Sequence, residues 1–150
     1  MGQALVLLGI DPIRKWTTVW CLAGLTAGAA TELATLALLR ARTCELLGET
    51  SSIADSSELF LVGLFSLLDV MLSRTMGEAL EGLPLSAAAT AALQGAPNTL
   101  RRVLDAVVAH ERGEWSEAAS LAEASGLKPS ALADASTSAL KWVQDAASAI

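Results

Sequence analysis

Residues 57–73, SELFLVGLFSLLDVMLS, form the most apolar segment of the chain. The segment predicts one helix, and because apolar side chains surround that helix it has to be buried on nearly all sides. Near its end the helix carries a narrow stripe of small and polar residues, namely Gly63, Ser66, Asp69 and Ser73. A buried carboxylate needs a partner. We therefore expect Asp69 to pair with Arg40 or Arg42, or else to be exposed along this stripe.

The length and hydropathy of the chain indicate one helical domain with a large core. A chain of 150 residues buries about two thirds of its unfolded surface. Charged residues make up only 17%, against roughly 25% in soluble domains, and the mean hydropathy is +0.49. The uncharged apolar run at residues 16–31 is shorter than the about 20 apolar residues of a membrane span. With no signal-peptide pattern at its start, we expect a cytoplasmic protein without a membrane span.

The charge and cysteine content disfavour nucleic-acid binding and a zinc site. The net charge is −6, from ten Lys and Arg against sixteen Asp and Glu, whereas nucleic-acid binding requires a basic face. Cys21 and Cys44 lie far apart in apolar helical segments, with no CxxC pair beside them. We interpret both as reduced thiols of the core.

Capping residues and glycines divide the chain into helices. Gly48 is expected to cap the second complete helix, and Ser57 to begin the buried one. Residues 98–112, with apolar side chains at i, i+3, i+4 and i+7, form the clearest amphipathic helix. No segment shows the alternation of a strand. We predict an all-α bundle of about seven to eight helices in a single domain, 1–150. Residues 1–8 are the end of a helix, complete helices follow at 12–27, 32–47, 57–73, 86–94, 98–112, 115–125 and 130–150, and a short turn covers 75–81.

The residues that could support chemistry are few. His110 is the single histidine, and its place at a helix end, near the carbonyl groups, is typical of a structural role. Glu111 and Glu114 are expected to form a solvated face. Trp16 and Trp20, four residues apart, are expected to pack as core side chains close to a partner surface. We expect no catalytic, cofactor-binding or metal-ligating residue.

Two blocks of the sequence resemble a known family. ELFLVGLFSLLDVMLSRTMGEALEGLPLS (58–86) and VVAHERGEW (107–115) resemble the HDOD family, the HD-related output domain of bacterial signalling proteins. The similarity is to copies that follow an EAL domain, the cyclic-diguanylate phosphodiesterase module. The matching positions are Leu7, Leu8, Gly9, Ile10, Arg14, Trp16, Arg40, Glu45, Leu46, Leu47, Phe60, Leu61, Gly63, Leu64, Ser66, Leu67, Leu68, Asp69, Glu111, Arg112, Gly113 and Trp115.

The resemblance implies a regulatory rather than a catalytic protein. The chain matches the C-terminal portion of an HDOD domain, with the N-terminal helices absent, and lacks the HD dipeptide of the related metal-dependent hydrolases. It therefore implies an HD-superfamily-like fold without a metal site. The implied function is a non-catalytic signalling or scaffold module that acts through protein contacts and regulates an attached EAL domain or a cyclic-diguanylate pathway.

Two other functions and one assembly state stay open. A small-molecule-sensing bundle would line its cavity with Trp16, Trp20 and the helix 57–73. A helical-repeat adaptor would use GEWSEAASLAEASG (113–126), although only one such unit is visible and stacking needs about three. Absence of the N-terminal helices would expose apolar faces, so we also expect a two-fold homodimer through helix 12–27, with Trp16 and Trp20 at or beneath the contact.

Overall fold

The computed structural model describes residues 30–83 and 85–149. The expected helices 1–8 and 12–27, with Trp16, Trp20 and Cys21, lie outside these residues. The chain divides into two compact units, Met1–Thr35 and Leu36–Ile150, and all contacts below belong to the second. The described residues contain helices and no strand, which confirms the all-α prediction. The helices are α3 (Ala30–Ser51), α4 (Ser56–Phe65), α5 (Leu68–Leu72), α6 (Met76–Ala79), α7 (Ala87–Leu93), α8 (Thr99–Glu111), α9 (Trp115–Ala124) and α10 (Pro129–Ala149).

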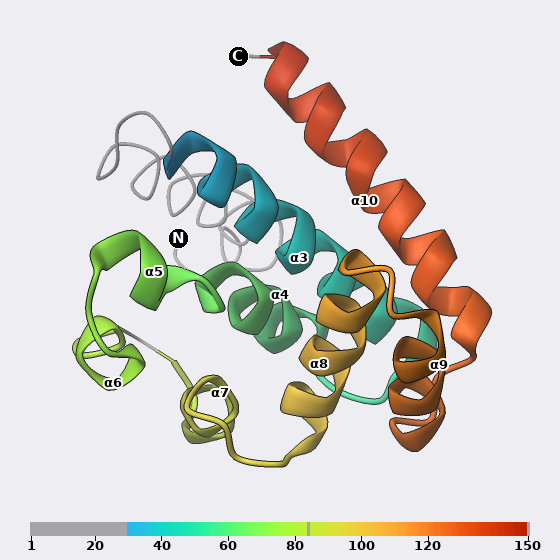
Figure 1. The fold of residues 1–150 in the computed structure, drawn as a ribbon, viewed down its shortest axis with the longest axis horizontal. Coiled ribbons are helices and arrows are strands. Elements are labelled where there is room, and N and C mark those ends of the chain that lie inside the picture. Colours follow the sequence, from blue (N-terminus) through green and yellow to red (C-terminus); the bar gives the residue numbers. More distant parts are fainter. Residues whose placement is uncertain (1–29, 84, 150) are drawn as a thin grey trace, which may run out of the picture. The chain divides into compact units, whose positions relative to one another are not determined.

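Helices α4 and α8 form the centre of the second unit (Figure 1). Helix α4 packs against α7 and α8, and α9 and α10 pack against α8. The side chains that fill the centre are almost fully buried: Leu59, Phe60, Val62, Leu64, Leu100, Val103, Leu104 and Val107. The apolar stripe predicted on 98–112 is thus the buried face of α8. No helix of the described part is both long and apolar enough to cross a membrane.

Local capping signals place several helix ends as predicted. The side chains of Thr75, Ser86 and Asn98 each accept a hydrogen bond from a backbone N–H three residues later, at 3.2, 3.0 and 3.0 Å. Gly113 ends α8 with φ of +75°, a left-handed conformation that a Cβ disfavours. These ends depend on interactions within a few residues, which explains why the sequence reveals them.

The predicted caps at Gly48 and Ser57 are wrong. Helix α3 continues through Gly48 to Ser51, and a Cβ at Gly48 would lie 2.7 Å from Leu59 Cδ1 and 3.0 Å from Ser56 Cα. Gly48 therefore lets α4 approach α3 closely instead of ending the helix. Asp55, not Ser57, caps α4, because its Oδ1 accepts hydrogen bonds from the backbone N–H groups of Ser57 and Glu58 at 2.8 and 3.3 Å.

The apolar segment 57–73 is two helices, not one. Ser66 donates from Oγ to the carbonyl of Gly63 at 2.7 Å, a side-chain bond that competes with the helical ladder, and α4 ends before it. The following α5 has five residues and ends at Ser73, where φ is +53°. The predicted burial on nearly all sides holds for α4, the first half of the segment. It does not hold for α5, where Val70 is 54% exposed.

Candidate functional site

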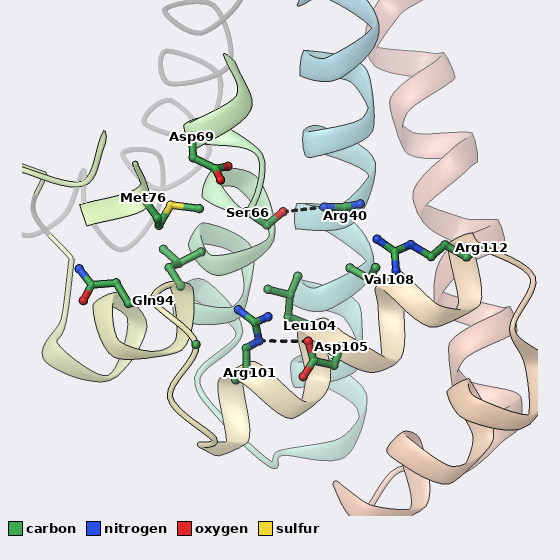
Figure 2. Close-up of a pocket in the computed structure, with 12 residues that line it drawn as sticks. Arg40, Ser66, Asp69, Met76, Gln94, Arg101, Leu104, Asp105, Val108 and Arg112 are labelled. Atoms are coloured by element: carbon green, nitrogen blue, oxygen red, sulfur yellow. Dashed lines mark hydrogen bonds and ion pairs between the residues drawn. The ribbon is translucent and has the colours of Figure 1, made fainter. Parts of the chain in front are cut away.

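A polar cleft of about 480 Å³ opens between α5, α7 and α8, with α3 behind it (Figure 2). This volume lies in the range of about 300–1,000 Å³ that small-ligand sites occupy. Three arginines (Arg40, Arg101, Arg112) and two aspartates (Asp69, Asp105) line it, together with a group of apolar side chains, Met76, Leu93, Leu104 and Val108. The cleft thus combines opposite charges with an apolar floor.

The innermost of the three cations is Arg40 of α3, which is only 9% exposed. Its Nε donates to both carboxylate oxygens of Glu111, at 3.0 and 2.8 Å, and its Nη1 donates to Ser66 Oγ at 3.2 Å. Burial of a guanidinium is costly unless its charge is paired and its donors are used. Arg40 meets that condition by joining the end of α8 to the end of α4.

This ion pair overturns the prediction that Glu111 forms a solvated face with Glu114. Instead the Glu111 carboxylate binds the buried Arg40 and its side chain is only 20% exposed, whereas Glu114 is exposed. The partners lie 71 positions apart, so no local pattern could reveal them.

Cys44, one turn after Arg40 on α3, is a buried free thiol, as predicted. The pKa of Cys44 is raised from 9.0 to about 12, chiefly by burial and also by the nearby Glu111 carboxylate, while Arg40 acts in the opposite direction. Since the thiolate is the nucleophilic form, Cys44 is poorly suited to chemistry near neutral pH.

Asp69 does not pair with Arg40 or Arg42. Arg42 instead binds Glu45 on its own helix and places its guanidinium 5.3 Å from the centre of the Trp142 ring. Asp69 lines the cleft, and its Oδ1 is buried without a hydrogen-bond partner in the described part of the chain. An unpaired buried acceptor is costly, so this oxygen calls for a donor.

The two outer cations belong to one face of α8. Arg101 Nε pairs with Asp105 at 3.0 Å, and Arg101 Nη1 donates to the Ala92 carbonyl at 3.1 Å. Arg112 is exposed and has no ion-pair partner among the described residues. The spacing 101, 105, 108 and 112 follows the turns of a helix, a signal for this polar face that our prediction did not use.

His110 lies outside the cleft. Its ring packs edge-to-face against Trp115, with 5.0 Å between the ring centres, and Trp115 itself is 64% exposed. Nowhere in residues 30–83 and 85–149 do three His, Cys, Asp or Glu side chains come together to hold a metal ion. Among the described residues, Arg40, Asp69, Arg101, Asp105 and Arg112 meet at the cleft, and such a set of charges can hold a polar ligand.

Two proteins of known sequence match the chain over most of its length. It is 32% identical over 116 residues to the uncharacterized protein YuxH of Bacillus subtilis (strain 168), which covers 75% of this chain and 28% of YuxH. It is also 32% identical over 114 residues to the cyclic di-GMP phosphodiesterase CdgJ of Vibrio cholerae serotype O1, covering 75% of this chain and 26% of CdgJ.

The chain therefore spans between a quarter and a third of each of these relatives. No family model matches it. No solved structure matches it at a significant level. The match to a cyclic di-GMP phosphodiesterase supports the predicted relationship to cyclic-diguanylate signalling proteins.

Proposed function

We propose that the chain is a non-catalytic regulatory module of a cyclic-di-GMP signalling protein and acts through contacts with a partner or an attached EAL domain. The observation that carries this proposal is the match to CdgJ, which takes in 75% of the present chain but only 26% of the phosphodiesterase. The similarity is thus to a minor portion of a longer signalling protein.

The side chains considered as candidates for catalysis make structural contacts or are buried, which supports the proposal. The imidazole of His110 packs on Trp115, Glu111 neutralises the buried Arg40, and the Cys44 thiol is buried with a raised pKa. These assignments support a module whose polar groups hold helices together. The homodimer through Trp16 and Trp20 stays a prediction, because both residues lie outside the described part.

A graft into CdgJ tests this proposal. The 114 matched residues of CdgJ would be deleted, or replaced by this chain, and hydrolysis of cyclic di-GMP would be measured for each protein. We expect deletion to change the rate and the graft to restore it, while the isolated chain shows no turnover. Hydrolysis by the isolated chain, or a deletion without effect on the rate, would contradict the proposal.

A further inference from the structure

We propose that the cleft between α5, α7 and α8 binds a guanine nucleotide, with the base at Asp69 and the phosphate at Arg112 and Arg101. The inference goes beyond the proposed function and does not depend on it, because it is argued from the groups that line the cleft. A failure of nucleotide binding would leave the regulatory role in CdgJ-like proteins untouched.

Asp69 lacks a hydrogen-bond donor within the described part of the chain. Arg40, which the sequence predicts as a partner of Asp69, instead donates from Nε to Glu111 and from Nη1 to Ser66. Asp69 Oδ1 is nevertheless buried at the cleft without a partner among the described residues. The Asp69 side chain lines the cleft, and its carboxylate can turn about the terminal bond. A ligand that enters the cleft and presents N–H groups to this carboxylate would supply the missing donor, which matters because an unpaired buried acceptor is costly.

Arg101 and Arg112 are the cations available to the phosphate of the ligand. Arg112 is exposed and unpaired within the described part of the chain. Asp105 and the Ala92 carbonyl bind two donors of Arg101, and no described residue accepts a hydrogen bond from its Nη2. Figure 2 shows both arginines beside Leu104 and Val108 on α8. Guanidinium groups suit phosphate because they combine a permanent charge with several planar donors.

A guanine nucleotide is the ligand class that meets both requirements. Its base carries two adjacent donors, N1–H and the 2-amino group, which match the two oxygens of a carboxylate, whereas adenine offers one donor on the corresponding edge. The purine ring would lie over Met76 and Val108, the partly exposed apolar side chains of the lining. The volume of about 480 Å³ is sufficient for a ligand of this size.

The decisive variant is Asp69→Asn, tested by calorimetric titration of the full 150-residue chain. An asparagine presents one acceptor and one donor, which match the N1–H and the 2-carbonyl group of xanthine. The original chain should bind GMP roughly tenfold or more tightly than XMP or AMP, since a bidentate pair discriminates to that extent. In the Asp69→Asn variant the preference between GMP and XMP should reverse.

Arg112→Gln and Arg102→Gln form a matched pair for the phosphate. Both arginines are exposed and near α8, but Arg102 does not line the cleft. Arg112→Gln should weaken GMP binding about tenfold, and Arg102→Gln should leave it unchanged. Because these exposed positions tolerate substitution, the pair remains informative even if Asp69→Asn fails to fold by circular dichroism.

Three results would overturn the proposal. They are no binding of GMP at millimolar concentration, binding of AMP as tight as that of GMP, and a loss of GMP binding on Arg102→Gln as large as that on Arg112→Gln. The last result would show that the affinity for GMP depends on the overall positive charge of the protein rather than on this cleft.

Discussion

Gly63→Ala should destabilise the protein, although alanine is the better helix former. Gly63 lies in α4 where this helix crosses α3, and its added Cβ would lie 2.7 Å from Ala41 Cα, 2.8 Å from Ala41 N and 2.8 Å from the Arg40 carbonyl carbon. All three atoms belong to the backbone, so no side chain can turn aside. The two helices would have to separate.

The expected size follows from two opposing terms. Replacing glycine with alanine inside a helix gains about 1 kcal/mol. Against this, overpacking a tight core costs about 1–3 kcal/mol or more, and here the shift also disturbs the buried Arg40 and its bond to Ser66 at 3.2 Å. We expect a net loss of about 1–2 kcal/mol in the free energy of unfolding, which lowers Tm by several degrees.

Gly77→Ala supplies the control for this experiment. Gly77 also lies in a helix, α6, but the nearest atom to its added Cβ would be Gln94 Nε2 at 3.8 Å. Here the propensity gain meets no clash, so stability should be unchanged or slightly higher. Urea unfolding followed by circular dichroism compares the variants. A Gly63→Ala protein as stable as the Gly77→Ala protein would refute the proposed close contact of α3 and α4.

Three further predictions follow from the contacts of α3 and α8. Gly113→Val should cost about 1–2 kcal/mol of unfolding free energy, because the site has φ of +75°; an unchanged melting curve would contradict this. Glu111→Gln should cost about 1–3 kcal/mol by leaving the buried Arg40 charge without its counter-charge, whereas the exposed Glu114→Gln should stay within about 0.5 kcal/mol. In a Cys21→Ser background, Cys44 should react with iodoacetamide at pH 8 only after unfolding, since burial raises its pKa from 9.0 to about 12. The unfolded chain releases this proton first, so stability should fall as the pH rises from 9 towards 12, and a Cys44→Ala variant should lose that part of the slope.

Sequence reasoning identified the elements whose signals are local. The apolar period of α8 and the caps at Thr75, Ser86 and Asn98 each involve residues within a turn or two. The left-handed conformation of Gly113 at the end of α8 is also a local signal. Such features depend little on the rest of the fold, and the all-α class follows from them.

The errors arose where a distant helix changes the role of a residue. Gly48 has the sequence context of a cap, but the approach of Leu59 gives it a packing role instead. Ser66 lies within an apolar run whose pattern otherwise predicts one continuous helix. Its hydrogen bonds with Gly63 and Arg40 accompany the break between α4 and α5. Whether a serine within a helix bends it, ends it or does neither depends on such partners.

The cleft depends both on a local sequence pattern and on contacts between distant helices. The face of α8 that carries Arg101 and Arg112 is a local pattern, but the wall opposite exists because α4 ends at Ser66 and Asp69 follows in a separate short helix. Arg40 holds this arrangement, since it binds Ser66 on one side and Glu111 on the other. An uninterrupted helix over 57–73 would carry Asp69 in a different direction. The buried ion pair and the unpaired carboxylate oxygen are therefore linked: by using Arg40 to hold the helix ends, the fold leaves Asp69 without the partner that the sequence predicts for it.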